Sequence, residues 1–284
     1  MDIIVEQLSE MVISLNNDFV YIDGKTPCYQ SRLFQKYGVS HGFFTRKGGV
    51  SRGAFSSLNF AVGVGEIRDD EAKVMQNYQL AAEFFGLNKE DICRTYQTHT
   101  SVVEIAGKGD RGRGVSIPPY DHGVDGLMTT EEKLLLSVRT ADCVPILLCD
   151  KEKRACAAVH AGWRGTVGGI IENAISKMVD AGVSRSDIIA AIGPCVGKCC
   201  YEVGEDVRSE FLVKFPESDG FFAPLGDKYM LDLVGVNELV LAGSGILPEN
   251  ISSASLCTKC REEEFFSHRR SGSVRGTMSA FIHI

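Results

Sequence analysis

The residues best suited to chemistry in this chain are Cys143 and His160, which lie in the stretch 134–168, LLLSVRTADCVPILLCDKEKRACAAVHAGWRGTVG. A thiolate and an imidazole that lie close together can bind a metal ion, or the thiolate can act as a nucleophile with the imidazole as its base. The alternative without a function is a buried cysteine beside a hydrogen-bonded histidine. Which of these three interpretations applies depends on the secondary-structure elements that position the two side chains.

Two apolar runs joined by a charged turn surround this pair, a pattern that predicts a β-hairpin. If Cys149 pairs with Ala155, then Val144 faces His160, and Cys143 lies within one residue of that histidine across the strands. Cross-strand neighbours have Cβ atoms about 5 Å apart, which suits two ligands of one metal ion. The hairpin therefore predicts that the thiol and the imidazole meet.

The segment after the second strand predicts an anion site. Residues 161–165 form a small-residue turn, and apolar residues at three-and-four spacing predict a helix from 166 to 181. The N-terminus of a helix carries unpaired N–H groups and a partial positive charge, and Arg164 adds a cation beside it. Such surroundings favour a thiolate and make Arg164 the first candidate for binding phosphate.

A catalytic zinc site needs a third protein ligand. The histidines that remain as candidates are His41, His99, His122, His268 and His283. Spacing alone does not choose among them. His99 is attractive because QTHT lies at a strand end between two β-like runs, whereas His283 alternates within a terminal strand and fits a core position equally well.

The composition argues for a small-molecule substrate. The net charge of -7 and the lack of a dense Lys/Arg stripe disfavour nucleic acid and membranes as partners. Asp2 and Glu6 stand where a secretory signal would carry positive charge, so we expect a cytoplasmic protein. The ten cysteines are then expected to be reduced thiols.

The order of predicted elements favours an α+β fold. Helices are expected at 70–85, 166–181 and 230–242. Strands are expected at 19–22, 41–45, 92–97, 101–106, 134–139, 144–149, 155–160, 188–193 and 278–284. Because runs of strands are broken by only a few helices, and no linker or repeat is evident, residues 1–284 are predicted to form a single domain.

Seven segments in consistent order resemble the YfiH family, which is associated with purine nucleoside phosphorylase activity. They are HGFFTRKGGVSRGAFSSLNF (41–60), QTHT (97–100), DGLMT (125–129), TADCVPILL (140–148), AAVHAGWRGT (157–166), IGPCVGKCCYEVG (192–204) and FFSHRRSG (265–272). The pair TADC and VHAGWRG is highly specific. The resemblance covers almost the entire chain.

The resemblance implies a layered α/β/β/α sandwich with mixed sheets and a zinc ion bound by His99, Cys143 and His160. It implies phosphorolysis of adenosine, inosine, guanosine or methylthioadenosine, together with adenosine deamination. The family also has an older label as a multicopper polyphenol oxidase, or laccase. Six histidines do not supply the imidazole ligands of several coppers, so we disfavour that activity, although copper can replace zinc in such a site.

Phosphorolysis needs a cationic site for phosphate, and Arg46, Arg164 and the pair Arg269 and Arg270 are the candidates. Arg270 gains weight because FFSHRRSG is one of the matching segments. The side-chain amides of Gln97 and Asn59 are candidates for binding the base or the sugar by hydrogen bonds. Asp142 is expected to point away from Cys143, because adjacent strand residues face opposite sides, and to orient a neighbouring group instead.

Three alternatives stay open. Cys143 could attack an amide or ester carbonyl with His160 as base, which agrees with a role of some family members in editing peptidoglycan precursors. A zinc-stabilised binding module is a weaker alternative, since three ligands leave a coordination position open. Finally, a second metal could bind among the cysteines of CVGKCC and CTKC, namely Cys195, Cys199, Cys200, Cys257 and Cys260, although buried thiols explain them as well.

Overall fold

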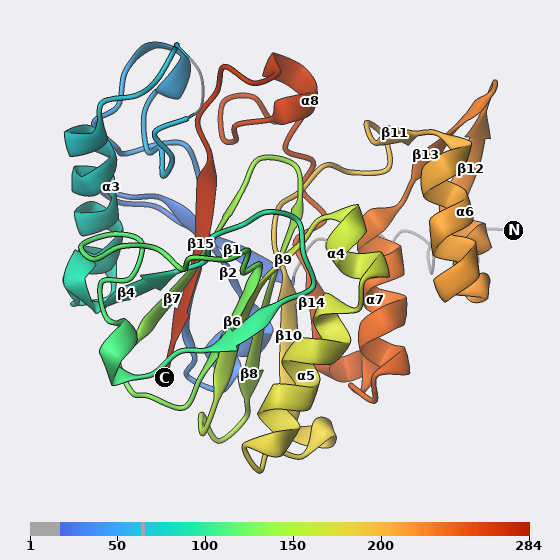
Figure 1. Ribbon diagram of the computed structural model, residues 1–284, viewed down its shortest axis with the longest axis horizontal. Coiled ribbons are helices and arrows are strands. Elements are labelled where there is room, and N and C mark those ends of the chain that lie inside the picture. The colour runs from blue at the N-terminus through green and yellow to red at the C-terminus, as the bar shows by residue number, and fades with distance from the viewer. Residues whose placement is uncertain (1–17, 64–65) are drawn as a thin grey trace, which may run out of the picture.

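The structure is a computed structural model that describes residues 18–63 and 66–284, so Asp2 and Glu6 lie outside the described residues. Two six-stranded sheets pack face to face, and helices cover their outer sides (Figure 1). This arrangement confirms a mixed α/β single domain with α/β/β/α layers.

The first sheet has the strand order β1-β2-β3-β15-β7-β4. Its strands are β1 (Phe19–Ile22), β2 (Cys28–Ser31), β3 (Ser40–Phe44), β15 (Met278–His283), β7 (Leu135–Thr140) and β4 (Ile92–Arg94). Only the β4–β7 pair is parallel, and the other neighbours are antiparallel. The strand β15, which is late in the sequence, therefore lies in the middle of this sheet.

The second sheet has the order β14-β10-β8-β9-β6-β5. Its strands are β14 (Ile251–Ser253), β10 (Ile188–Ile192), β8 (Val144–Asp150), β9 (Cys156–Ala161), β6 (Gly126–Thr129) and β5 (Val103–Ile105). Both edge strands pair in parallel, while the four central strands are antiparallel. The hairpin that carries the candidate ligands thus forms the centre of this sheet.

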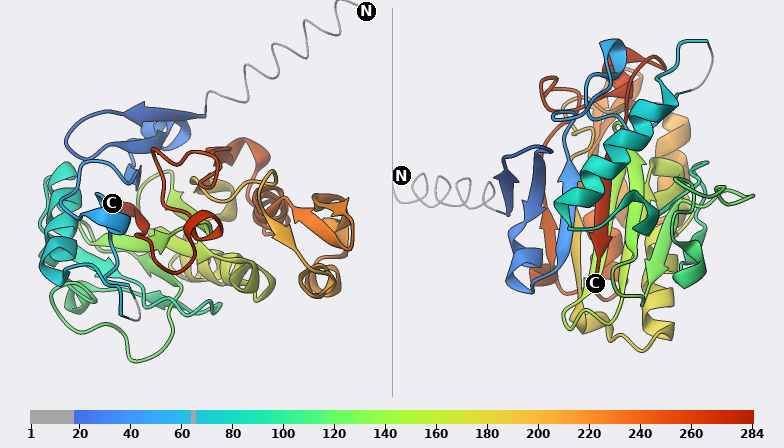
Figure 2. Two further views of the ribbon diagram at one scale, coloured as in Figure 1. Left: turned by 90° about the horizontal axis from the view of Figure 1, so that it is seen from above. Right: turned by 90° about the vertical axis from the view of Figure 1, so that its left-hand side faces the viewer.

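A third, three-stranded sheet and the helices complete the fold. Its order is β11-β13-β12, with bounds β11 (Glu202–Val203), β13 (Lys228–Leu231) and β12 (Phe222–Leu225). The helices are α2 (Arg32–Lys36), α3 (Glu71–Phe84), α4 (Trp163–Val167), α5 (Ile170–Asp180), α6 (Glu205–Lys214), α7 (Leu233–Gly243) and α8 (His268–Ser271). The helix α3 and the region of α6 lie at opposite ends of the molecule (Figures 1 and 2).

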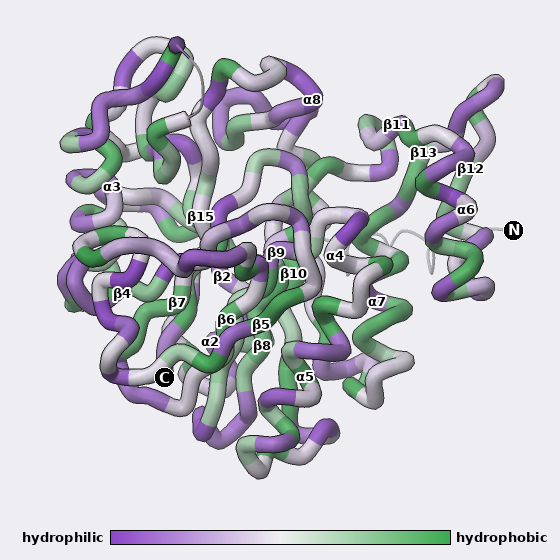
Figure 3. The backbone as a smooth tube through the Cα atoms, in the orientation of Figure 1, coloured by the Kyte–Doolittle hydropathy of each residue, from purple (hydrophilic) through white to green (hydrophobic). Residues whose placement is uncertain are grey.

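Three buried clusters follow the layers. Alternating residues of β8 serve two of them: Leu147 and Cys149 face the first sheet, while Ile146 and Leu148 face α5 and α7. Such strands, buried on both faces, read as continuous apolar runs. The third cluster lies between α3 and the first sheet and is rich in aromatic rings, with Phe281 at its centre. Figure 3 shows the hydrophobic residues concentrated in the central strands and in α7.

Most expected elements are present. Each of the nine predicted strands overlaps an observed strand, and α3 begins after Asp70, whose carboxylate accepts a hydrogen bond from the Ala72 amide and caps the helix. The helix predicted at 230–242 begins later, at Leu233, because Lys228–Leu231 forms strand β13. Several short elements had no prediction, including β2, β6 and the three-stranded sheet. Their segments are too short for a periodic pattern to identify.

The predicted hairpin exists, but its register was wrong by one residue. Cys149 pairs with Cys156 instead of Ala155, so Pro145 faces His160. The turn is one residue shorter than predicted, 151–154 instead of 150–154, because the Asp150 amide donates to the Ala155 carbonyl, at 3.0 Å, and extends the pairing to Asp150. A slip of one residue changes the face on which side chains lie.

The helix predicted from 166 to 181 is two helices. The helix α4 begins at Trp163, directly after Gly162, and α5 begins at Ile170. Gly169 between them has φ of 85°, a left-handed conformation that interrupts an α-helix and favours glycine. Of the turn expected over 161–165, residues 163–165 are therefore already helical, and Ala161 ends β9.

Within residues 18–63 and 66–284, no helix has both the length and the apolar composition that crossing a membrane requires.

Candidate metal centre

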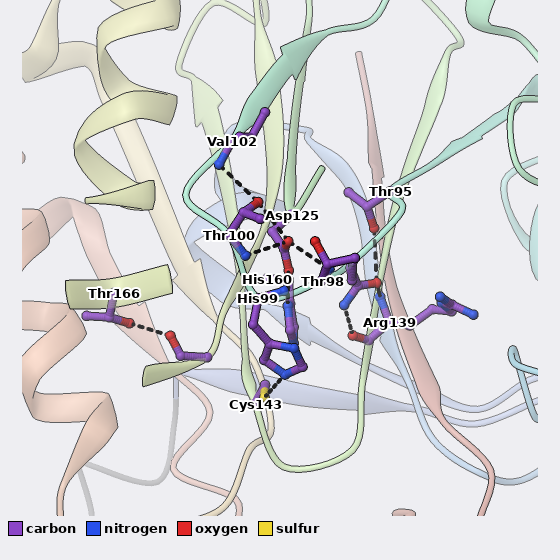
Figure 4. A network of polar contacts seen from close by, with 12 residues as sticks. Thr95, Thr98, His99, Thr100, Val102, Asp125, Arg139, Cys143, His160 and Thr166 are labelled. Carbon is purple, nitrogen blue, oxygen red and sulfur yellow. Dashed lines mark hydrogen bonds and ion pairs between the residues drawn. The ribbon is translucent and has the colours of Figure 1, made fainter. Parts of the chain in front are cut away.

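Three side chains from separate segments meet at one end of the two sheets (Figure 4). His99 lies in the loop between β4 and β5, Cys143 lies in the loop between β7 and β8, and His160 lies near the end of β9. One potential ligand atom from each lies within 4.8 Å of the others. The Cys143 Sγ atom is 4.0 Å from Nε2 of His99, and the two imidazole centroids are 5.1 Å apart.

The buried carboxylate of Asp125 holds both histidine segments in place. Its Oδ1 atom lies 2.7 Å from Nδ1 of His160 and accepts a hydrogen bond from the His99 amide, while Oδ2 accepts from the amides of Thr98 and Thr100. An ionised carboxylate can only accept, so Nδ1 of His160 donates, and its Nε2 atom is the one free to bind a metal. A carboxylate behind a ligating histidine is a frequent arrangement in metal sites.

The loop that carries His99 has an uncommon backbone conformation. His99 has φ of 64°, in the left-handed region that few residues other than glycine adopt. The Asp125 carboxylate binds three consecutive amides, which compensates for this conformation. Residues held in such conformations cluster at functional sites.

Cys143 follows a second strained residue. Asp142 has φ of 100°, and residues 141–143 form bends instead of strand, so strand alternation does not apply there. The Asp142 carboxylate accepts hydrogen bonds from the Thr258 and Ser267 hydroxyls and from the Arg269 amide. Its buried side chain therefore anchors the segment 258–269 next to the metal-binding group.

Gly162 allows the close approach of the ligands. A Cβ atom at this position would lie 3.2 Å from Cys143 Sγ and 3.3 Å from His99 Cδ2. Both distances are shorter than ordinary van der Waals contact, so a larger residue would displace the thiol or the ring. This close approach explains the glycine that follows the VHA segment.

The electrostatics favour a thiolate beside the two imidazoles. Burial raises the pKa of Cys143, but the neighbouring His160 and His99 rings lower it below its ordinary value. Burial lowers the pKa of His160, whereas the Cys143 thiolate and Asp125 raise it above its ordinary value. Burial raises the pKa of Asp125, and hydrogen bonds from His160 and the Thr100 and Thr98 amides bring it down to about 2. The group is thus predisposed to bind a cation.

Two cavities open onto this group. The first, which we name the tyrosine cavity, has a volume of about 660 Å³ including its opening to solvent. The second, the arginine cavity, has a volume of about 790 Å³ including its opening. Both are lined by His99 and Cys143 and share Arg275, so they meet at two of the three candidate ligands. Val196, Tyr201, Leu233, His268 and Arg269 belong to the tyrosine cavity alone, and Gln97, Arg139, His160 and Thr277 to the arginine cavity.

Among the described residues, three that line the arginine cavity each have one buried polar atom without a partner. In the described part of the chain, Nε of Arg139, Nε of Arg275 and Oγ1 of Thr277 are buried and have no hydrogen-bond partner. Burial and the charge of Arg94 lower the pKa of Arg139 to about 10, and burial also lowers the pKa of Arg275. Buried cations and donors of this kind are costly unless an anion or another acceptor pairs with them.

The structure brings only some of the predicted substrate-binding residues to these cavities. Gln97 lines the arginine cavity, where its amide binds the backbone N–H and carbonyl of Arg139. Arg164 lies exposed at α4, with its guanidinium over the Trp163 ring, and does not line either cavity. Among the histidines considered as a third ligand, His99 joins the group and His268 lines the tyrosine cavity.

The other three predicted residues make contacts within the fold. Arg46 stacks on Phe266 and donates to backbone carbonyls, and it lines a different, shallow depression. Buried Asn59 binds Asp69 and the backbone at Ala61 and Thr277. Arg270 donates to the carbonyls of Thr258, Lys259 and Phe265. The structure does not bring these three side chains to the candidate ligands.

Sequence reasoning gave no role to Asp125, Arg139 or Arg275. Asp125 is the first residue of the DGLMT segment, and Arg139 is the single charge at the end of the apolar run 134–138, so both positions carried a signal. Arg275 carried none, because only the tertiary fold places it beside Cys143.

The chain is a mixed α/β protein with a candidate mononuclear metal centre at the meeting point of two cavities. A family model described as multi-copper polyphenol oxidoreductase laccase matches residues 40–284, and the chain belongs to this family, the YfiH family.

Curated relatives and solved structures support this family membership. The purine nucleoside phosphorylase YlmD of Geobacillus stearothermophilus is 36% identical over 86% of this chain and 90% of its own length. Its crystal structure covers 94% of this chain and 98% of its own, with a TM-score of 0.85. The YfiH structure from Bacillus licheniformis has the same TM-score at 32% identity, covering 94% of this chain and 99% of its own. An adenosine deaminase from an unknown prokaryotic organism is 35% identical over 82% of this chain and 90% of its own.

Proposed function

We propose that the protein is a zinc-dependent purine nucleoside phosphorylase with accompanying adenosine deaminase activity. The names of its relatives support both activities. The observation that carries the proposal is the position of His99, Cys143 and His160 at the junction of two cavities, one of which contains Arg139 and Arg275 with unpaired buried donors. Phosphorolysis requires such a junction, because phosphate and nucleoside must meet at one carbon atom.

The donor set fits zinc. Two imidazoles and one thiolate leave a fourth tetrahedral position open, as in catalytic zinc sites. His99 is exposed and Cys143 is partly exposed, so this position faces the cavities. Bound zinc would supply a Lewis acid that polarises a substrate oxygen or acidifies a water. Copper binds such a set as well, so a copper-loaded preparation would not establish a copper enzyme.

We assign phosphate to the arginine cavity. The side chains of Arg139, Arg275 and Thr277 line this cavity, where the two guanidinium groups would bind the phosphate oxygens. The hydrogen bonds between Gln97 and the Arg139 backbone would fix the position of the first guanidinium. Arg164, the first candidate from the sequence, stays a prediction that the same experiments test.

We assign the purine to the tyrosine cavity. Tyr201, Val196 and Leu233 provide flat and apolar contacts for a base, and Arg269 stacks over the Tyr201 ring at 4.9 Å. In phosphorolysis, a phosphate oxygen forms a bond to C1′ of the ribose while the bond from C1′ to the base breaks. The electron pair of that bond moves to the purine, which then takes up a proton.

Product analysis tests this proposal. Adenosine is incubated with the purified protein with and without phosphate, before and after chelation, and after zinc is restored. We expect adenine and ribose 1-phosphate that depend on phosphate and disappear on chelation, with inosine as the product of deamination. Conversion that persists unchanged in the chelated protein would refute the metal dependence.

A specific contact supports a second candidate. The Nδ1 atom of His160 binds Asp125, so Cys143, His160 and Asp125 have the order of a nucleophile, its base and the group that orients the base. A cysteine hydrolase acting on peptidoglycan precursors would use this order. Chelation discriminates the two, because it abolishes phosphorolysis and leaves a free thiolate able to act.

The donor set does not favour a laccase. Among the described residues, the two groups of at least three possible metal ligands are His99, Cys143 and His160, and a set of four cysteines. A multicopper oxidase needs several imidazole-rich sites. The ten free cysteines fit a reducing compartment, and we propose that the enzyme acts in the cytoplasm.

A further inference from the structure

A second group of thiols lies outside the candidate metal centre. Cys199 and Cys200 lie in the loop between β10 and β11, and Cys257 and Cys260 lie in the loop between β14 and α8. Their four Sγ atoms lie within 4.8 Å of one another. Cys195, the fifth cysteine of these loops, is buried in the core beside the second sheet and is not a member.

The separations between sulfur atoms fit a metal site. Sγ of Cys260 lies 3.5 Å from Sγ of Cys200 and 3.7 Å from Sγ of Cys199. Zinc–sulfur bonds of about 2.3 Å in a tetrahedron place neighbouring sulfur atoms about 3.8 Å apart. A disulfide would bring two of them to about 2.0 Å. The two separations from Cys260 therefore match those around one tetrahedral ion, and the other pairs lie within 4.8 Å.

The backbone around the thiols has features of a metal-binding loop. Cys257 and Cys260 have the two-residue spacing that is common in structural zinc sites. The Gly197 amide donates to Cys257 Sγ at 3.3 Å, a contact that stabilises a thiolate. A Cβ atom on Gly197 would lie 3.2 Å from Cys257 Cβ and 3.4 Å from Cys199 Sγ, so glycine lets the two loops approach.

Both loops are held together and carry a nearby positive charge. The Cys195 amide donates to the Leu256 carbonyl, and the Thr258 amide donates to the Cys195 carbonyl. The Arg270 guanidinium donates to the carbonyls of Thr258 and Lys259, between the two thiols of the second loop. A cation at this position offsets part of the negative charge that several thiolates bring.

We propose that Cys199, Cys200, Cys257 and Cys260 bind one zinc ion with four thiolates, in a structural site separate from the candidate metal centre. Four protein ligands leave no open position, which is the property of structural zinc sites. Binding releases the protons of those thiols that are neutral in the free protein. Exposure of Cys199 and Cys260 gives the ion access to the site.

The site would stabilise one wall of the tyrosine cavity. Val196 and Tyr201 of the first loop line this cavity, and the Thr258 hydroxyl of the second loop binds Asp142 beside Cys143. A metal ion that joins the loops fixes these residues relative to the candidate ligands. Its loss is therefore expected to raise KM for the nucleoside more than it lowers kcat.

Metal analysis of protein purified anaerobically in the presence of zinc tests this inference. We expect the unchanged chain to hold one ion more than Cys260→Ser, and the matched control Lys259→Ala, within the same loop, to keep the full content. His99→Ala removes only the ion of the other centre, so the two assignments fail or succeed separately. Cys199→Ser serves as a second variant should Cys260→Ser not fold.

Cobalt gives a second measurement. Cobalt bound by four thiolates has intense thiolate-to-metal charge-transfer absorption, which Cys260→Ser and Cys199→Ser should lose and His99→Ala should largely keep. Equal metal content in Cys260→Ser and Lys259→Ala would overturn the proposal. A disulfide among the four thiols in the anaerobic protein, detected by mass after alkylation, would also overturn it and indicate a redox pair instead.

Discussion

The carboxylate of Asp125 accepts a 2.7 Å hydrogen bond from Nδ1 of His160 and, with the same two oxygens, binds the backbone of the loop that carries His99. One buried side chain therefore sets the positions of two of the three candidate ligands. The third, Cys143, depends on a different aspartate, Asp142, which anchors its loop to the segment 258–269.

We expect Asp125→Asn to lower zinc affinity by roughly 10- to 100-fold, because a neutral amide binds the His160 Nδ1–H and the loop amides less strongly. Competition with a chromogenic chelator measures the affinity, and phosphorolysis should fall in parallel at limiting zinc. Asp121→Asn is the matched control, since its exposed carboxylate binds only His122. Unchanged zinc affinity in Asp125→Asn would remove this residue from the proposed site.

Cys143→Ala should lose the ion of the candidate metal centre together with phosphorolysis, because the change removes a ligand together with its charge. Metal content and adenine release are measured on the same preparation. Cys149→Ala, in the buried strand that follows, should keep the metal because its thiol faces the core between the sheets. Full activity of Cys143→Ala would refute the metal assignment.

Arg139→Gln and Arg275→Gln should each raise KM for phosphate about 10- to 100-fold, the effect of losing a charge-assisted hydrogen bond of about 1.5–3 kcal/mol. KM for the nucleoside should change less with Arg139→Gln, since Arg139 lines only the arginine cavity. Initial rates at varied phosphate measure both constants. Arg164→Gln distinguishes the arginine cavity from the start of α4 as the phosphate site. A large increase in KM for phosphate in Arg164→Gln, with no change in Arg139→Gln, would assign phosphate to the start of α4.

Gly162→Ala should weaken zinc binding without unfolding the protein. The added methyl group would lie 3.2 Å from Cys143 Sγ and 3.3 Å from His99 Cδ2, so one of the two ligands must shift. Gly243→Ala is the matched control, because a Cβ atom at that position meets no atom within 4 Å. Zinc affinity and thermal unfolding are compared for both. Equal zinc affinity in the two variants would show that the ligands tolerate the methyl group.

The buried, neutral ring of His41 should make the protein less stable in acid. Burial lowers its pKa from 6.5 to about 4, and its Nε2 atom accepts a hydrogen bond from the Ser31 amide, which only the neutral ring can do. The unfolded chain takes up this proton near pH 6.5 and the folded chain only near pH 4, so stability falls as the pH drops between these values.

This residue should contribute about 2 kcal/mol of the decrease in unfolding free energy between about pH 7 and pH 5. Urea unfolding at both values measures it. His41→Gln should be less stable at neutral pH but should lack this part of the pH dependence, whereas other titrating groups act equally in both proteins. The same pH dependence in both proteins would contradict the assignment.

The sequence predicted most strands because strands depend on local patterns, whereas the layered sandwich and the group of His99, Cys143 and His160 were implied by the family resemblance. Apolar runs such as 144–149 identify strands directly, and the TADC and VHAGWRG segments are specific enough to indicate two ligands. The hairpin register was wrong by one residue, because the backbone hydrogen bond from Asp150 to Ala155 that shortens the turn has no signature in the pattern of apolar residues.

The arginine cavity illustrates what the sequence could not predict. Arg139 and Arg275 are far apart in the chain. They line the same cavity as Cys143 because β15 pairs with β7, with Met278, the first residue of β15, opposite Thr140. Conversely, Arg46, Asn59 and Arg270 have suitable chemistry but make contacts within the fold. Residue type identifies candidates, whereas long-range strand pairing decides which of them reach a cavity.

The central position of β15 has a consequence for synthesis of the protein. On the ribosome, β3 and β7 emerge long before residues 278–283, which must later insert between them. Until then, two strand edges and an incomplete aromatic core are exposed, and neither Arg275 nor Thr277 has reached its position. A growing chain therefore cannot bind phosphate in the proposed way, and activity should begin only after residue 283 has left the exit tunnel.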